Sequence, residues 1–501
     1  MTRTFTGSPY HESSAYWLTA IEDRSHNRIT IARRGDGTPT SVSHSGGYVA
    51  TLSSGSGRLR ELSLRTPEGP RTVMRYGYDE LGRLTEIVDS SDLPLRLTYD
   101  PDGRITSWTD RNGSTFRYVY DSDGRVVRTV GPDGYLSSTF TYDVHPATGD
   151  RITRFTDSTG ASKVYVLNSH LQVVSVTDPR GNTVRQTWDR YDRLLSRTGP
   201  AGRTTTYTYD DRGNLTAIAH PDGSSAGVEY NERNQITVVT GPDGAVSRQE
   251  YDEDGNPVLF TRPNGTTTRL TYDTRGRLTG VDDSLGAVDR VENDAAGLPL
   301  AVRGQHGGVT RYVRDAFGRP VRITDPQGGS TELEWTVEGR LARRTDPDGA
   351  TQSWAYDGEG NCVLHTDAMG GETRFEYTHF DLVAARTTPD GVRHEFAHDT
   401  EPRITRVTNP QGLTWSYTYD ETGLLTAETD FDGRTPHLHA RRTRTDRLAD
   451  QRSRPDGPLR AGRRRSSPPE GRRRGGHPLH LRRPWPPLRG ERPGHRAELR
   501  P

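Results

Sequence analysis

Polar and apolar side chains alternate along most of this chain in short runs that turn-forming residues separate. In residues 99–120, the runs RITSWT and STFRYVY alternate with a period of two, which is typical of half-buried strands. The sequences DPDG and DRNG separate these runs, and clusters of this kind are typical of tight turns. One copy of the pattern is therefore predicted to hold two short strands and two turns, so that successive copies form an antiparallel meander.

The pattern keeps a fixed period, which a Tyr-Asp step marks every 21 residues. The step is clear at Tyr78-Asp79, Tyr99-Asp100, Tyr120-Asp121, Tyr142-Asp143, Tyr209-Asp210, Tyr251-Asp252, Tyr272-Asp273, Tyr356-Asp357 and Tyr419-Asp420. Degenerate copies keep the phase at Leu167, Trp188, Tyr230, Asn293, Arg314, Trp335, Tyr377 and His398. Twelve consecutive intervals of 21 residues run from Leu167 to Tyr419 without insertion or deletion. A period of this length indicates stacked supersecondary units, so function is expected in the assembled surface rather than in one pocket.

The fourth residue after each anchor, as we call the first residue of the step, is usually Gly, and otherwise most often Asp or Asn. These three residue types tolerate positive φ, so a left-handed turn conformation is predicted at this position. Leu171 and Pro402 break the rule, and the turn is expected to differ there.

Successive anchors are two strands apart and are predicted to line one face of the sheet as an aromatic row, whose role is to maintain the fold. Seventeen anchors imply about 34 strands, whereas open sheets rarely exceed ~10 strands without curling or closing. The predicted fold is therefore all-β: a long antiparallel meander of hairpins that coils into a spiral wall or partial shell.

Composition divides the chain into three parts. Residues 1–75 are interpreted as degenerate N-terminal repeats, residues 76–433 as the array of 21-residue units, and residues 434–501 as an Arg/Pro-rich tail. Residues 435–501 hold 19 Arg against 6 acidic residues, whereas residues 1–434 hold 48 basic and 61 acidic residues. An acidic repeat body is a poor nucleic-acid binder, because phosphate binding depends on clustered cations.

Three interpretations of the tail stay open: a basic tail that binds nucleic acid or membrane, a disordered segment without a selected role, or the product of a reading-frame error. Ordered structure is predicted to end near residues 430–436, because the Pro-rich sequence beyond lacks backbone donors for a further strand. No run of 18 apolar residues is present, so no membrane span is predicted, and the first residues carry no visible signal peptide.

Two short motifs resemble catalytic signatures. His394, Glu395 and His398 match HExxH, but the string falls in a predicted strand, where four residues span about 13 Å and the two histidines cannot share a zinc ion. Residues 223–227 match GxSxG, but a turn and a further strand surround them rather than a strand, a turn and a helix.

Other candidates for chemistry are also better explained by structure. The acidic turn at residues 252–255 lacks the ligand series of an EF-hand, and the only cysteine, Cys362, excludes an intrachain disulfide framework or a CxxC-type zinc site. We therefore expect a non-enzymatic protein with no catalytic, cofactor-binding or metal-binding residues and no cofactor.

The copies YDELGRLTEIVD at 78–89 and YDTRGRLTGVDD at 272–283 resemble the Rhs/YD-repeat family, and the resemblance covers residues 78–433. Relatives include the cocoon subunits of insecticidal toxin complexes and the teneurin adhesion proteins. The resemblance implies a β-shell that coils around a cargo, commonly a variable C-terminal toxin used in competition between bacteria. It also implies a secreted or cell-surface protein that leaves the cell by a specialised route.

The chain departs from the full family pattern. Complete members close the core with a DPxGL-type segment, and the nearest string here, Asn409–Leu413, begins with Asn and precedes an ordinary repeat. We therefore expect a truncated shell segment whose toxin cargo is absent. Two alternatives from other classes remain: a surface adhesin that binds glycan or cell-wall polymer through aromatic rows, and a metallopeptidase that uses His394, Glu395 and His398.

Overall fold

The computed structural model describes residues 2–7, 16–286 and 288–435. The first half of the sheet consists of β1 (Thr2–Gly7), β2 (Tyr16–Glu22), β3 (Arg28–Arg33), β4 (Pro39–His44), β5 (Val49–Gly55), β6 (Arg58–Thr66), β7 (Gly69–Tyr78), β8 (Leu84–Val88), β9 (Pro94–Tyr99), β10 (Ile105–Thr109), β11 (Thr115–Tyr120), β12 (Val126–Val130), β13 (Ser138–Val144), β14 (Arg151–Thr156), β15 (Ser162–Leu167), β16 (Val173–Thr177), β17 (Thr183–Trp188), β18 (Leu194–Thr198), β19 (Thr204–Tyr209) and β20 (Leu215–Ala219).

The second half consists of β21 (Ser225–Tyr230), β22 (Ile236–Thr240), β23 (Val246–Tyr251), β24 (Pro257–Thr261), β25 (Thr267–Tyr272), β26 (Leu278–Asp283), β27 (Val288–Asn293), β28 (Pro299–Arg303), β29 (Val309–Arg314), β30 (Pro320–Thr324), β31 (Ser330–Trp335), β32 (Leu341–Thr345), β33 (Thr351–Tyr356), β34 (Cys362–Thr366), β35 (Glu372–Thr378), β36 (Leu382–Thr387), β37 (Arg393–His398), β38 (Ile404–Thr408), β39 (Thr414–Tyr419) and β40 (Leu425–Thr429). The two helical elements of the described residues are single 3-10 turns, η1 (Pro132–Gly134) and η2 (His379–Asp381).

All 40 strands form one sheet, and each strand pairs antiparallel with the next in the sequence, from β1 with β2 to β39 with β40. Turns therefore alternate between the two ends of the strands. At one end lies the turn that comes after each anchor, such as residues 79–83, which we call the anchor turn. At the other end lies the second turn of each copy, such as residues 110–114, which we call the distal turn. The all-β meander predicted from the alternation is confirmed.

The sheet is one layer thick and buries little apolar surface. The buried apolar side chains are those of Ala20, Val126, Val238, Ala301 and Ala385, and no large side chain among the described residues is fully buried. Strand residues on both faces are mostly half-buried, as in β17, where exposed Arg185 alternates with half-buried neighbours. Hydrogen bonds between strands and polar contacts between turns must therefore provide much of the cohesion.

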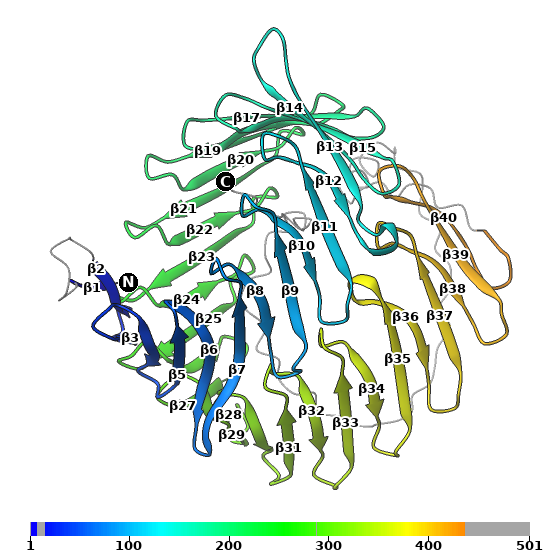
Figure 1. Ribbon diagram of the computed structural model, residues 1–501. Coiled ribbons are helices and arrows are strands. Elements are labelled where there is room, and N and C mark those ends of the chain that lie inside the picture. Colours follow the sequence, from blue (N-terminus) through cyan, green and yellow to red (C-terminus); the bar gives the residue numbers. More distant parts are fainter. Residues whose placement is uncertain (1, 8–15, 287, 436–501) are drawn as a thin grey trace, which may run out of the picture. The chain divides into compact units, whose positions relative to one another are not determined.

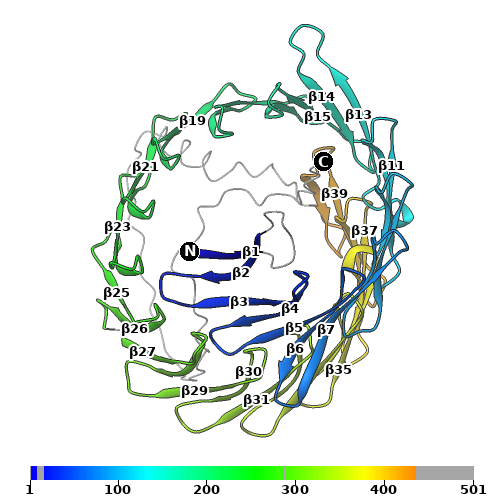
Figure 2. The ribbon, with the colours of Figure 1, turned by 60° about the vertical axis from the view of Figure 1, so that its left-hand side comes forward.

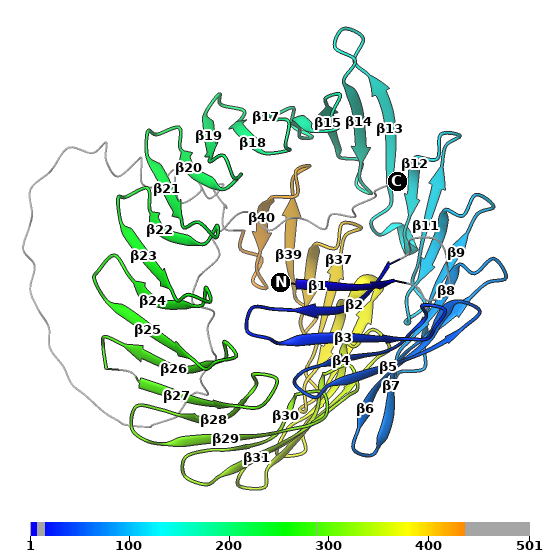
Figure 3. The same ribbon diagram turned by 90° about the vertical axis from the view of Figure 1, so that its left-hand side faces the viewer.

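Within residues 2–435, the sheet winds back on itself, so that the turns of β31 to β36 face the turns of β8 to β11 (Figures 1 and 3). In Figure 2, β19 to β31 follow one another along the curved wall of the coil. Hydrogen bonds join residues 240–265 positions apart in sequence, including Asn112 with Asp357 and Ser114 with His379. The coiling predicted from the number of strands is thus present.

The fourth residue after an anchor has positive φ in every copy except that of Tyr142, as predicted for glycines such as Gly82 and for Asp192, Asn234 and Asp381. In the longer turn after Tyr142, Gly149 has the positive φ instead. The expectation that the turn differs at Leu171 is wrong, since Leu171 has φ +63° and its N–H donates to the carbonyl of Asn168 at 3.0 Å, as Gly82 does to Asp79. Pro402 also has positive φ, although it lacks the N–H for this bond. The neighbouring strands therefore impose the turn on residues that do not favour it.

No helix among the described residues is long and apolar enough to cross a membrane. The predicted end of ordered structure near 430–436 and the three interpretations of the tail concern residues 436–501, which lie outside the described part of the chain.

Candidate functional site

Each anchor side chain closes a gap in the backbone ladder. The register shifts at the anchor, so that Gly77 pairs with Glu86 but Tyr78 pairs with Leu84, which is a β-bulge. The carbonyl of Leu84 at this bulge accepts a hydrogen bond from the hydroxyl of the next anchor, Tyr99, at 2.7 Å. The anchor row therefore satisfies one backbone carbonyl in most copies, which explains why a residue with both a ring and a donor recurs.

Degenerate anchors keep the donor and change only the side chain. Trp188 donates from Nε1 to the carbonyl of Val173 at 2.8 Å, and Asn293 donates to Leu278 at 2.6 Å. Arg314 donates to Pro299, and Arg33 in the N-terminal segment donates to Leu18, again 15 residues back. Arg33 therefore occupies an anchor position that the lack of tyrosine conceals in the sequence.

Two anchors do not make this bond. Leu167 has no donor, and Nδ1 of His398 is buried without a hydrogen-bond partner among the described residues. Burial lowers the pKa of His398, although the charge of Asp399 opposes the shift. The imidazole of His398 is therefore held in its neutral form and takes the position of a tyrosine ring.

The Asp of each step builds the anchor turn. Oδ1 of Asp79 accepts the backbone N–H groups of Leu81 and Arg83 at 3.0 and 2.8 Å, and Oδ2 accepts the guanidinium of Arg83 at 2.7 Å. The backbone N–H of Arg83 is the main cause that holds the pKa of Asp79 below its ordinary value, and desolvation opposes this shift. Asp79 is therefore ionised at neutral pH and fixes the turn.

The Arg that comes after the turn glycine links one copy to the next. The guanidinium of Arg83 donates to the carbonyl of Asp100 at 2.9 Å and lies 5.0 Å from the ring centroid of Tyr99. The same cation–π contact is present at Arg104–Tyr120, Arg125–Tyr142, Arg193–Tyr209, Arg340–Tyr356 and Arg403–Tyr419. The predicted aromatic row is therefore an alternation of tyrosine rings and guanidinium groups.

Where Arg is absent, another pair closes the turn. Asn214 donates to Oδ2 of Asp210 at 2.9 Å, so Asn replaces the guanidinium beside an aspartate. Where the step carries Asn in place of Asp, Gln occupies the Arg position: Nδ2 of Asn168 donates to Oε1 of Gln172 at 2.8 Å. The two turn residues therefore change together, and the fold accepts either an ionic or a neutral pair.

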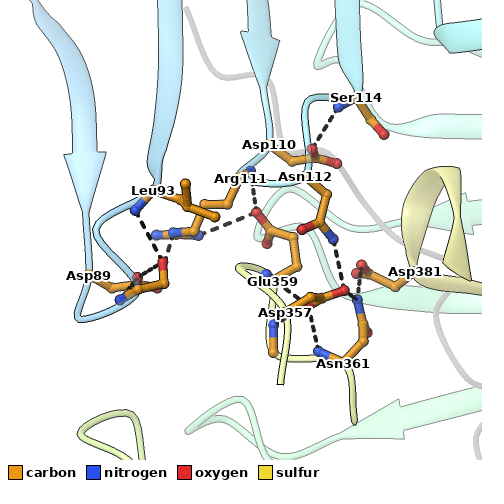
Figure 4. Close-up of polar contacts among 12 residues, drawn as sticks. Asp89, Leu93, Asp110, Arg111, Asn112, Ser114, Asp357, Glu359, Asn361 and Asp381 are labelled. Carbon is orange, nitrogen blue, oxygen red and sulfur yellow. Dashed lines mark hydrogen bonds and ion pairs between the residues drawn. The ribbon is translucent and has the colours of Figure 1, made fainter. Parts of the chain in front are cut away.

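A second set of polar residues joins successive turns of the coil, and we call it the seam (Figure 4). Arg111 on a distal turn places Nε 3.0 Å from Oδ2 of Asp89 and Nη1 3.5 Å from Oε1 of Glu359 on an anchor turn. Oε1 of Glu359 also accepts the backbone N–H of Arg111 at 2.6 Å. The side chain of Arg111 is only 12% exposed, so both carboxylates are needed to compensate its burial.

An aromatic cluster completes the seam beside this ion pair. The ring of Phe380 in η2 lies 6.2 Å from those of Trp108 and Phe116, and Phe380 has φ +58°. Next to it, His379 contacts the hydroxyl of Ser114 at 2.9 Å and the carboxylate of Asp133 at 3.1 Å. Sequence reasoning missed the whole seam, because the anchor turns and distal turns that face each other there are 240 or more residues apart.

The motifs that resemble catalytic signatures lie apart from the seam and in strands. His394, Glu395 and His398 belong to β37, where neighbouring side chains point to opposite faces. Ser225 begins β21 directly after a turn. The thiol of Cys362 in β34 is half-buried, and burial raises its pKa. The described residues contain no group of three or more His, Cys, Asp or Glu side chains placed to hold a metal ion.

Several crystal structures share this fold at low sequence identity. TcdB2-TccC3-TEV is 16% identical with a TM-score of 0.57, TcdB2-TccC3-Cdc42 is 15% identical with a TM-score of 0.58, and TcdB2-TccC3 without its hypervariable C-terminal region is 16% identical with a TM-score of 0.56. Each match covers 80% of this chain and 24% of the other, so this chain spans about a quarter of the length of those proteins. No curated protein matches it at a significant level.

At family level the match extends along the repeat array. The family described as Teneurin YD-shell matches residues 10–225 and 224–429, which together make up most of the chain. The matched residues include the anchors, the anchor turns and the seam, so the resemblance drawn from the Tyr-Asp repeats is confirmed. The chain belongs to the teneurin YD-shell family.

Proposed function

We propose that this chain is a wall segment of a protein shell that encloses or presents a polypeptide cargo. The observation that carries the proposal is the continuous 40-stranded sheet whose turns are joined by hydrogen bonds and ion pairs along the seam. A single-layer sheet that winds back on itself suits a wall better than a globular binding domain. The fold shared with TcdB2-TccC3 structures supports this role.

We further propose that the role is structural rather than catalytic. All anchor side chains except those of Leu167 and His398 bond a backbone carbonyl, as Tyr99 does, and arginines such as Arg83 bond the next turn. The HExxH-like and GxSxG-like strings lie in strands and turns whose residues serve the ladder. A toxin-type cargo and export to the cell surface or the medium belong to the same proposal and rest on the family.

The alternative of a glycan-binding adhesin receives less support. Stacking on a sugar requires a free aromatic face, whereas guanidinium groups lie over several anchor rings, including Tyr99, Tyr120 and Tyr209. The anchor hydroxyls are also bound to carbonyls. We therefore retain the shell as the single proposed function.

A protease-protection experiment tests the proposal. A flexible reporter peptide of defined protease sensitivity is attached to the C-terminus of the full chain and, as a control, to an unrelated soluble carrier. If the wall encloses a polypeptide attached at this end, the reporter on this chain is cleaved at least ten times more slowly than on the carrier. Equal cleavage rates on the two proteins would refute enclosure.

A further inference from the structure

The seam contains a repeated bond between a carboxylate of an anchor turn and a backbone amide of a distal turn. Oε1 of Glu338 accepts the N–H of Ser90 at 3.1 Å, and Oε1 of Glu359 accepts that of Arg111 at 2.6 Å. The third bond joins Oε1 of Glu401 to the N–H of Ser158 at 3.0 Å. In each case the donor is the second residue of a distal turn, and the acceptor is the third residue after an anchor.

Glutamate occupies that acceptor position in these three copies alone. In the other fourteen of the seventeen anchor turns the residue is Leu81, Asp102, Asp123, His145, His170, Tyr191, Arg212, Arg233, Asp254, Arg275, Ala296, Phe317, Phe380 or Thr422. Glutamate therefore occurs at this position only in the copies whose facing distal turn donates a backbone N–H to it.

Two distal turns of this region make no such bond, because proline occupies the donor position. They carry Pro132, between Arg111 and Ser158, and Pro179, beyond Ser158, and proline has no N–H to donate. The facing anchor turns carry Phe380 and Thr422 at the acceptor position. Side chains make the contact there instead. Asp133 binds His379, and the guanidinium of Arg180 binds Asp420 at 2.6 Å.

The bonds pair one repeat copy with another, and not residues at one fixed separation in the sequence. The bonds of Ser90 and Arg111 both span 248 residues, whereas that of Ser158 spans 243. The copies that begin at Tyr120 and Tyr142 hold 22 and 25 residues, which is five more than two ordinary copies hold. These five extra residues lie between Arg111 and Ser158. The insertion therefore leaves the pairing of copies unchanged.

We propose that these three glutamates determine which repeat copy in the second winding of the coil faces each copy in the first winding. The prolines that alternate with their amide donors contribute to the same choice. A slip by one copy in one direction would keep only Glu338 against the amide of Arg111, because Glu359 and Glu401 would face Pro132 and Pro179. The opposite slip would keep only Glu359 against Ser90, because Glu401 would face Pro132 and Glu338 would face Pro67.

The native register therefore makes three carboxylate–amide bonds, and either neighbouring register makes one. The native register sets one winding of the coil at between eleven and twelve copies. The bond from Ser158 to Glu401 spans 243 residues without an insertion, which corresponds to that number of 21-residue copies. The register in turn sets the girth of the coil. This register is a property of the coil itself, whether or not the shell encloses a cargo.

Hydrogen exchange of the full chain tests the three bonds. We expect the amides of Ser90, Arg111 and Ser158 to exchange at least tenfold more slowly than those of Gln305 and Ala368. Those two residues occupy the same position of distal turns, and their amides have no acceptor among the described residues. The Glu359→Ala variant should lose protection at Arg111 and keep it at Ser158. Equal exchange at all five amides would overturn the proposal.

Cross-linking tests the register, and the chain suits it because Lys163 is its only lysine. Nδ2 of Asn112 donates to Asp357 at 3.0 Å, so an Asn112→Lys variant treated with a carbodiimide should form an amide to Asp357 or Glu359, with loss of water. The matched control, Asn264→Lys, occupies the same position of a distal turn that faces no anchor turn among the described residues, and should give no long-range cross-link.

In the Asn112→Lys background, Glu338→Ala with Glu401→Ala removes two of the three bonds. We expect the yield of the cross-link to fall at least threefold while circular dichroism retains the strand signal. An unchanged yield in a folded variant would show that other seam contacts set the register and would overturn the proposal.

Discussion

Trp188 donates its indole N–H to the backbone carbonyl of Val173 across 2.8 Å, which is the bond that a tyrosine hydroxyl makes in most other copies. A residue that interrupts the Tyr-Asp repeat in the sequence thus preserves its chemistry in the structure. The requirement at an anchor is a half-buried donor that reaches the carbonyl at the preceding bulge, and three residue types besides Tyr provide it.

Replacement of Trp188 separates the donor from the ring. Trp188→Phe should leave the carbonyl of Val173 unpaired and lower the local free energy of unfolding by about 1 kcal/mol, whereas Trp188→Tyr should restore most of it. Because repeat arrays open in segments, hydrogen exchange of β16 to β18 is the appropriate measurement. Equal exchange in the two variants would mean that the ring, not the donor, stabilises the anchor.

Arg193 allows the linking role of the arginine to be measured. It binds Asp189 at 2.6 Å and lies 5.1 Å from the ring centroid of Tyr209. Arg193→Ala should cost about 1–2 kcal/mol, from a partly exposed ion pair and a cation–π contact. Arg193→Asn should cost less, because Asn214 beside Asp210 shows that Asn can bind the turn aspartate. Segmental exchange around β18 and β19 compares the variants, and equal losses would contradict this account.

Leu171 holds a left-handed backbone conformation, with φ +63° and a side chain 55% exposed. Leu171→Gly should therefore stabilise the turn by about 1 kcal/mol, since the left-handed region costs a residue with a Cβ roughly 1–2 kcal/mol. Leu81 provides the control: it is an exposed leucine of an anchor turn outside the positive-φ set, so Leu81→Gly should bring no gain. Local exchange in the two turns is the readout, and a gain at Leu81 equal to that at Leu171 would contradict the strain argument.

Acid should loosen the repeat body through its turn aspartates. The pKa values of Asp79 and Asp121 lie below their ordinary value, chiefly because backbone N–H groups of Arg83 and Arg125 bind the carboxylates. A lowered folded-state pKa gives stability that is present above the ordinary value near 4 and is lost as pH falls through the folded-state pKa. Exchange of the 79–83 turn measured between pH 5 and pH 2 should show this loss.

The chain provides a matched control for that titration. Asp79→Asn combined with Arg83→Gln copies the neutral Asn168–Gln172 pair and should flatten the pH dependence of that turn alone. If the variant turn responds to acid as the native one does, the carboxylate of Asp79 is not its cause.

Alkali should destabilise the anchors in the opposite manner. Burial, and then the charge of Asp252, raises the pKa of Tyr272 to about 12. A raised folded-state pKa gives stability that is complete below the ordinary value near 10 and is lost as pH rises from there to about 12. Tyrosinate absorbance should therefore rise late, together with loss of the strand signal. Early titration of all tyrosines in a folded protein would contradict the anchor bond.

The sequence was sufficient for the local structure, because a period of two gives strands and Gly or Asn near the turn gives positive φ. It was also sufficient for coiling, because too many strands succeed one another for an open sheet. It misled at Leu171, where neighbouring strands impose a turn that the residue disfavours. The sequence showed that Trp188, Asn293 and Arg314 all carry a hydrogen-bond donor. Only the structure shows that each donor binds a backbone carbonyl 15 residues earlier.

The seam could not be predicted in the same way. Which anchor turn meets Ser90 depends on the number of copies in one turn of the coil, and this number results from small twists added over many strands. The signal was nevertheless present in Glu338, Glu359 and Glu401, at one position of the repeat and in no other copy.

The small core has a consequence for the temperature dependence of stability. Heat capacity rises on unfolding mainly because apolar surface becomes hydrated, and polar surface opposes that rise. A sheet whose buried apolar side chains are chiefly alanine and valine exposes little new apolar area when it unfolds. Its stability curve should therefore be flatter than that of a globular domain of equal length, so the wall should weaken little on cooling.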